Sequence, residues 1–238
     1  MRTLEQISKI KENFDSPKTI KKFLNDTDIN HLIDIYEKDC SLNGPYTNVV
    51  RKNTGPVTLD LQHYLEDPVV KKILTNLRSY LGNYSITAAF FFRTDYPHII
   101  HNDDTFELPD TVFKGITLPL ELEGFNGVYP KLCFFDQHYF HGPAKFFNRD
   151  KDIPTYYNKQ IYEYSNVDDL SKDKFIDSEK YFSHLKPQWL EGLSLQTAID
   201  WIPGDAIIFD SVQLHCASDF RNLGIKTKLG ISIFTKKD

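Results

Sequence analysis

The chain has 238 residues, a formal net charge of -5, 40% hydrophobic residues and 26% charged residues, as expected for an ordinary globular protein. The acidic balance argues against a broad nucleic-acid-binding surface, and no apolar run is long enough to predict a transmembrane helix. Three scattered cysteines (Cys40, Cys133 and Cys216) form neither a disulfide framework nor a CxxC zinc site, and the charged start "MRTLEQISKIKENF" is unlike a secretory signal. We expect one cytoplasmic domain over residues 1–238 that binds neither nucleic acid nor membrane.

Residues 1–82 are expected to form a helical cover. Apolar residues recur at helical spacing on both sides of a break at residues 25–28: Ile20, Phe23 and Leu24, then Ile29, Leu32, Ile33 and Tyr36. The clearest helix is predicted in "DPVVKKILTNLRSYLG", where Asp67 can cap the N-terminus, Pro68 suits the first turn and Gly82 ends the helix.

From residue 84 onward the hydrophobic period changes to that of strands. β-Branched and aromatic residues predict six strands, in "YSITAAFFFRT", "KGITLPLELE", "YPKLCFFDQHYF", "LSLQTAIDW", "AIIFD" and "KTKLGISIFT". Many short strands behind a helical N-terminal segment favour a mainly β fold, a β-sandwich or jelly roll, over residues 84–238.

Residues 148–192 interrupt the predicted strands without a clear period. The segment is charged and rich in tyrosine, and two interpretations stay open. It is either a surface insertion or a lid over a binding site, which is a frequent role of long loops in compact domains.

The stretch "PHIIHNDDTF" contains candidate metal ligands. His101 and Asp103 have the spacing that places two side chains on one face of a strand. By itself this pair is ambiguous, because a polar strand end rich in His and Asp has the same pattern.

A second element near the C-terminus strengthens the metal interpretation. In "WIPGDAIIFDSVQLH", a tight turn at residues 203–205 precedes a short apolar strand, and the chain then reaches His215. Two histidines and one carboxylate on a β-scaffold are the ligand set of non-haem Fe(II) oxygenases, which leave three coordination positions open. His101, Asp103 and His215 are therefore the predicted metal ligands and catalytic residues.

These pieces, "HND" at 101–103, "PGDAIIFDSVQLH" at 203–215 and the final "KLGISIF", resemble the Fe(II)/2-oxoglutarate-dependent dioxygenases. Within that superfamily the chain resembles the phytanoyl-CoA dioxygenase-type hydroxylases. The resemblance covers residues 84–238 apart from 148–192. It implies a double-stranded β-helix, a cupin-like jelly roll, with the first motif giving His and Asp ligands and the second ending in the distal His.

The resemblance also implies a basic residue shortly after the distal histidine that binds the far carboxylate of 2-oxoglutarate. That residue is usually Arg followed two positions later by Ser, whereas this chain has Lys228 followed by Gly230. Lysine meets a carboxylate as a point charge without the planar fork of arginine. We predict Lys228 for this role, Lys226 as the alternative, and Thr117 as a hydroxyl that completes the pocket.

Several neighbouring residues have weaker claims to a role in the site. We expect Asp104 and His98 either to contact the ligands without binding the metal or to lie at the surface. Arg93 either anchors an acidic group of the substrate or, as we expect, pairs with a surface carboxylate. "DQHYFH" is a rival metal cluster, formed by Asp136, His138 and His141. The aromatic residues at 90–92 and 134–135 are expected in the core.

The favoured function is hydroxylation of an unactivated C–H bond of a small molecule, with Fe(II), O2 and 2-oxoglutarate as cosubstrate and release of succinate and CO2. Related halogenases have a small residue in place of the carboxylate ligand, so Asp103 favours hydroxylation. The alternatives are a cupin-like metal-binding or isomerase module without redox chemistry, and an oxygenase that acts on a protein side chain.

Overall fold

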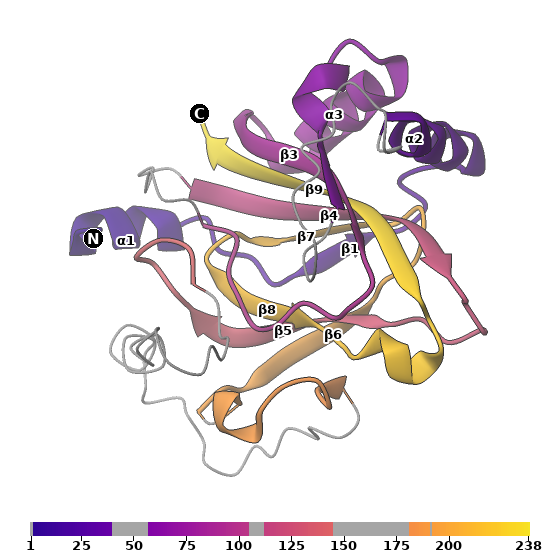
Figure 1. Ribbon diagram of the computed structural model, residues 1–238. Helices are drawn as coiled ribbons and strands as arrows, with labels where there is room; N and C mark the ends of the chain where they lie inside the picture. The colour runs from indigo at the N-terminus through magenta and orange to yellow at the C-terminus, as the bar shows by residue number, and fades with distance from the viewer. Residues whose placement is uncertain (1, 40–56, 105–111, 145–180, 191) are drawn as a thin grey trace.

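The computed structural model describes residues 2–39, 57–104, 112–144, 181–190 and 192–238. In these ranges two antiparallel β-sheets lie face to face, and the fold is the predicted double-stranded β-helix, or jelly roll (Figure 1). Within the same ranges, no helix has the length and apolar character needed to cross a membrane.

The larger sheet has six strands in the order β1-β7-β4-β9-β3-β2, and the smaller sheet has three in the order β6-β5-β8. The bounds in the larger sheet are Lys18–Ile20 (β1), Val57–Asp60 (β2), Tyr84–Thr94 (β3), Val112–Glu123 (β4), Ala206–Asp210 (β7) and Thr227–Lys237 (β9). Those in the smaller sheet are Lys131–His138 (β5), Leu195–Asp200 (β6) and Gln213–Ala217 (β8). Each of the six strands predicted from residue 84 onward is present.

Two helices, α2 (Asp26–Asp39) and α3 (Pro68–Leu81), cover the outer face of the larger sheet (Figure 1). The prediction for α3 is confirmed: the Asp67 side chain accepts the N–H groups of Val69 and Val70, and Gly82 ends the helix at a φ of 73°. The apolar face of α3 and the outward side chains of the sheet form the largest core cluster, which also contains a short 3₁₀ helix, η1 (Leu61–Tyr64).

Helix α1 (Leu4–Lys11) lies near one end of the two sheets (Figure 1). Its buried face, formed by Ile7 and Ile10, packs against Val112, Phe140 and Val212. Because apolar burial is the main stabilising contribution in folding, this small cluster fixes the N-terminal segment to the end of the barrel.

The expectation that residues 1–82 are helical is wrong in two places. Lys18–Ile20 form β1 and pair with β7, and Val57–Asp60 form β2 and pair with β3. The helical spacing of Ile20, Phe23 and Leu24 is overridden because the sheet edges offer backbone partners to these segments. A turn follows β1, in which the N–H of Lys22 donates to the Asp205 carboxylate at 2.9 Å.

Most of the predicted insertion at 148–192 lies outside the described residues. The choice between a lid and a surface segment therefore stays a prediction. Its last part is described, and there Phe182 and Leu185 are buried against the outer face of the smaller sheet. A 3₁₀ helix, η3 (Pro187–Trp189), follows them. Residues 181–190 therefore belong to the packed fold.

Candidate metal and cosubstrate site

The structure brings His101, Asp103 and His215 together, and we call them the His-Asp-His triad. Their potential ligand atoms lie within 4.8 Å of one another, and within the described residues no other group of three His, Cys, Asp or Glu side chains does so. The Asp103 carboxylate lies 3.6 Å from Nε2 of His101 and 3.5 Å from Nε2 of His215. Three potential ligands that suit a divalent metal, two imidazoles and one carboxylate, thus converge on one point.

Backbone hydrogen bonds hold the triad in place. His101 and His215 each donate an N–H to the carbonyl of the other, at 2.9 and 2.8 Å, although they come from distant parts of the sequence. The N–H of Asp103 donates to the carbonyl of Ser211 at 2.8 Å. The segment with the HxD pair therefore runs as an extra edge beside β8, and this edge fixes the side chains relative to one another.

Each histidine ring has its orientation set by a second backbone contact. Nδ1 of His101 lies 2.7 Å from the carbonyl of Ile99, and Nδ1 of His215 lies 3.0 Å from the carbonyl of Gln213. A carbonyl only accepts, so Nδ1 carries the proton and Nε2 keeps its lone pair toward Asp103. Burial and the neighbouring His215 lower the pKa of His101 well below its usual value, which keeps this ring neutral and able to bind a metal.

The triad opens into a cavity of about 520 Å³ between the two sheets. Side chains from β3, β4 and β9 line one wall, and side chains from β5 and β8 line the other. The lining outside the triad includes Phe90, Phe92, Thr117, Trp201, Lys228, Ser232 and Phe234. It is mostly apolar, with one lysine and a few hydroxyl groups.

Among the described residues, Lys228 is the only lysine or arginine that lines the cavity, and it is only 4% exposed. Its Nζ lies 4.7 Å from the ring centre of Trp201 and 5.1 Å from that of Phe220. Within the described part of the chain, no carboxylate forms an ion pair with it. Burial lowers the pKa of Lys228 from 10.5 to about 7, partly offset by the thiols of Cys133 and Cys216.

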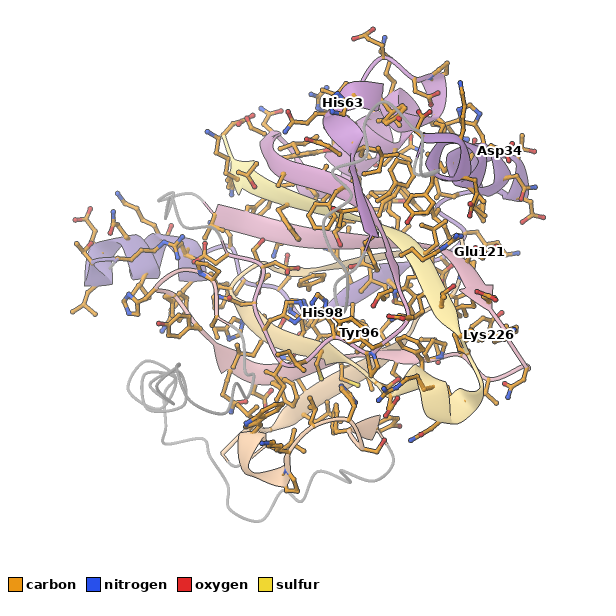
Figure 2. All side chains as sticks on the ribbon, in the orientation of Figure 1. Asp34, His63, Tyr96, His98, Glu121 and Lys226 are labelled. Atoms are coloured by element: carbon orange, nitrogen blue, oxygen red, sulfur yellow. The ribbon has the colours of Figure 1, made fainter. Side chains whose placement is uncertain are left out.

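The other two predicted cosubstrate residues lie in different places. Thr117 is buried and lines the cavity, opposite Ser232 in the pairing of β4 with β9. Lys226 does not reach the cavity, because it precedes the first residue of β9 and its side chain is 72% exposed (Figure 2). There its Nζ lies 3.7 Å from the carboxylate of Glu123. Of the two lysines proposed for the cosubstrate, only Lys228 therefore lies in the cavity.

Asp104 follows the ligand Asp103, lines the same cavity and is held by a residue that the sequence analysis missed. The guanidinium of Arg2 forms a two-pronged ion pair with the Asp104 carboxylate and also donates to the carbonyl of Phe140. Both charged side chains are almost completely buried. The pair ties the start of the chain to the metal-ligand loop, and nothing in the spacing of Arg2 pointed to it.

His98 lies between the two sheets (Figure 2). Its ring centre is 4.5 Å from that of His101, and the side chain lines the cavity. The ring therefore contacts a predicted metal ligand, as expected, and it also lines the cavity, which the sequence did not predict.

The rival metal cluster does not assemble. Nδ1 of His138 contacts the Asp136 carbonyl, whereas its ring stacks on Phe14 with the ring centres 4.3 Å apart. Asp136 is exposed, and His141 lies elsewhere, close to Arg2.

Arg93 pairs with surface carboxylates, as expected. Its guanidinium lies 2.6 Å from Glu37 and 2.7 Å from Glu121.

The aromatic residues predicted in the core divide between two environments. Phe91, Phe134 and Phe135 are fully buried, as expected. Phe90 and Phe92 instead face the cavity, because alternation along β3 places them on the side opposite Phe91. Two of the five aromatic residues expected in the core, Phe90 and Phe92, are therefore part of the cavity wall.

Comparisons with known proteins agree with the fold. No protein-family model matches the sequence, and no curated protein does. Among solved structures, the non-heme alpha ketoglutarate dependent epimerase SnoN from nogalamycin biosynthesis is 13% identical, with a TM-score of 0.54 over 98% of this chain and 83% of that one. The alpha ketoglutarate dependent carbocyclase SnoK, from the same biosynthesis, is 11% identical, with a TM-score of 0.53 over 99% of this chain and 84% of that one.

A third similar structure is EvdO2 from Micromonospora carbonacea var. aurantiaca. It is 10% identical, with a TM-score of 0.51 over 100% of this chain and 92% of that chain. At these identities the likeness establishes a shared jelly-roll fold, and the activity has to be argued from the site of this chain.

Proposed function

We propose that this protein is an Fe(II)- and 2-oxoglutarate-dependent oxygenase that hydroxylates an unactivated C–H bond of a small molecule. One observation carries the proposal: the His-Asp-His triad and a buried ammonium group without a carboxylate partner in the described chain line the same cavity. A metal and a dicarboxylate would complement these two features together.

The donor set fits Fe(II). Two neutral imidazoles and one carboxylate are the ligands of the facial triad, and their Nδ1 hydrogen bonds to backbone carbonyls are the usual way in which a protein orients such ligands. His101, Asp103 and His215 would hold the iron in this proposal. The carboxylate of Asp103 occupies the position that a halide needs in related halogenases, which favours hydroxylation.

Lys228 would bind the far carboxylate of 2-oxoglutarate, with the hydroxyls of Thr117 and Ser232 on the same wall of the cavity. With iron, 2-oxoglutarate and O2 bound, the site would supply the oxidising power for C–H hydroxylation, with succinate and CO2 as coproducts. The protein's own part is orientation and exclusion of water, for which the rings of Phe90 and Phe92 supply apolar walls.

The substrate is proposed to be a small molecule, since the cavity lies between the two sheets, is mostly apolar and has a volume of about 520 Å³. Two of the similar structures are an epimerase and a carbocyclase, so they do not point to hydroxylation. The proposal of hydroxylation therefore rests on the chemistry of the site in this chain. The order of the sequence motifs further favours a hydroxylase of the phytanoyl-CoA dioxygenase type. We propose that the chain forms one domain.

A metal-binding or isomerase module without redox chemistry is the alternative. Such a module has no need for the buried ammonium of Lys228, whose desolvation destabilises the fold unless an anion binds. An oxygenase acting on a protein side chain would share the site, and it is a second alternative.

The test is anaerobic addition of 2-oxoglutarate to the Fe(II)-loaded protein, followed by visible absorption and by succinate release in air. The proposal predicts a weak charge-transfer band and turnover of 2-oxoglutarate, both lost when any member of the triad is changed to Ala. His138→Ala, in the rival cluster, is the matched control and should keep both. Iron binding without any response to 2-oxoglutarate would favour the non-redox module.

A further inference from the structure

The rings of Trp201 and Phe92 pack closely against Gly230, which has no side chain. A Cβ atom at this position would lie 2.9 Å from Cζ2 of Trp201, 3.1 Å from Cζ of Phe92 and 3.0 Å from the carbonyl oxygen of Leu118. Such separations are shorter than ordinary van der Waals contact. The glycine that follows Lys228 by two positions is therefore needed so that the Trp201 ring can lie against β9.

The Trp201 ring lies beside the ammonium group of Lys228. Nζ is 4.7 Å from its ring centre, and the ring of Phe220, on the 3₁₀ helix η4 (Phe220–Leu223), is at 5.1 Å. Trp201 and Phe220 are almost fully buried, so this contact is shielded from water. Cation–π attraction is strongest under those conditions.

A lysine needs such support more than an arginine would. Its ammonium group is a single point charge on a flexible stem, and it lacks the planar fork that aligns arginine with a carboxylate. Two ring faces near Nζ limit the directions in which the stem can point. They therefore supply a constraint that the side chain does not have by itself.

We propose that Trp201, resting on Gly230, is a positioning residue that holds the Lys228 ammonium toward the distal carboxylate of the cosubstrate. This inference rests on the proposed function, because it assigns the dicarboxylate to Lys228. It adds that Trp201 and Gly230 act as a unit. The ring aims the charge, and the glycine makes space for the ring.

The experiment compares two ligands that differ only at the far end. 2-Oxoglutarate and 2-oxopentanoate share the 2-oxo acid head, but the second has a methyl group in place of the distal carboxylate. Their dissociation constants are measured by calorimetry on the anaerobic Fe(II) protein. The ratio of the two constants reports on the contact with the distal carboxylate, whereas a general disturbance of the cavity weakens both ligands together.

Trp201→Leu should reduce the preference for 2-oxoglutarate by about 5- to 30-fold, the equivalent of one desolvated cation–π contact. Gly230→Ser should act in the same direction, because its side chain displaces the indole ring. Trp201→Phe should restore most of the preference. Trp189→Leu is the matched control, since this ring also lies beside a lysine, Lys186, but does not line the cavity, and it should leave the ratio within about twofold.

The possible results distinguish the proposed function from the positioning role of Trp201. A wild-type protein without any preference for 2-oxoglutarate would overturn both the proposed function and the inference. A preference that Lys228→Met removes, but that Trp201→Leu and Gly230→Ser leave intact, would overturn the positioning role alone. If Trp201→Leu does not fold, Gly230→Ser and Phe220→Leu decide the question.

Discussion

Replacing Lys228 with Met should have opposite effects on stability and on cosubstrate binding. The two side chains are similar in length, so the packing against Trp201 and Phe220 is largely kept. The substitution removes a charge whose burial is unfavourable in the free protein. It also removes the group proposed to bind the distal carboxylate.

The effect on stability follows from the lowered pKa of Lys228, about 7 in the folded protein against 10.5 when unfolded. Between these values the unfolded chain binds more protons, so the free energy of unfolding of the wild type rises with pH across this window. From pH 6 to pH 9 this one group should contribute about 2–3 kcal/mol. Lys228→Met lacks the contribution and should gain most over the wild type at pH 6.

The effect on binding has the opposite sign. A charge-assisted contact is worth about 1.5–3 kcal/mol, so the KM for 2-oxoglutarate should rise by roughly 10- to 150-fold. Iron affinity should remain within about twofold, because Lys228 lies outside the triad. Urea unfolding at pH 6 and pH 9, with steady-state kinetics on the same samples, measures both effects. Equal stability differences at the two pH values, or an unchanged KM, would refute the reasoning.

Four further predictions address the surroundings of the site. Alanine in place of any member of the triad should abolish iron binding in equilibrium dialysis while circular dichroism stays native, and His138→Ala should change neither measurement. Arg2→Met should destabilise the protein by about 3–5 kcal/mol in urea unfolding, because it leaves the buried carboxylate of Asp104 without its partner; a loss below about 1 kcal/mol would contradict this. Gly115→Ala should weaken iron binding, because the added Cβ would lie 2.6 Å from the Phe209 ring and 3.3 Å from the Asp103 carboxylate, and unchanged affinity would show that the ring moves aside. Binding of 2-oxoglutarate at pH 8 should take up close to one proton, because Lys228 is then mostly neutral in the free protein. At pH 5.5 the lysine is already protonated, so calorimetry in buffers of different ionisation enthalpy should detect no proton uptake. Equal proton uptake at the two pH values would contradict the assignment of Lys228.

Local sequence signals predicted the helix α3 and six of the seven strands described from residue 84 onward, all except β8. Asp67, Pro68 and Gly82 act within a few residues of themselves, so their effect is visible in the sequence. The strands β1 and β2 were missed because they form only through pairing with distant partners, which neither composition nor periodicity records. Tertiary pairing decides the conformation of short segments at sheet edges.

The candidate site divides in the same way. The HxD pair and the distal histidine were recognisable because each belongs to a short ordered pattern, and the fold brings all three together. The environment of Lys228 was not predictable, since Trp201 reaches it from another part of the chain through the space at Gly230. Arg2 likewise acts over a long sequence separation, and a single arginine near a chain end carries no signal of its partner.

The reciprocal backbone pair between His101 and His215 also bears on the order of events in folding. It joins segments separated by nearly half of the chain, and contacts of that kind form late because a long loop must close first. The layer of α3 against the larger sheet needs a longer closure still, between β3 and β9, so both sheets form in the same late stage. Metal capture would then be a final step on a scaffold already formed, and protein produced under iron starvation should accumulate as a folded, reloadable species.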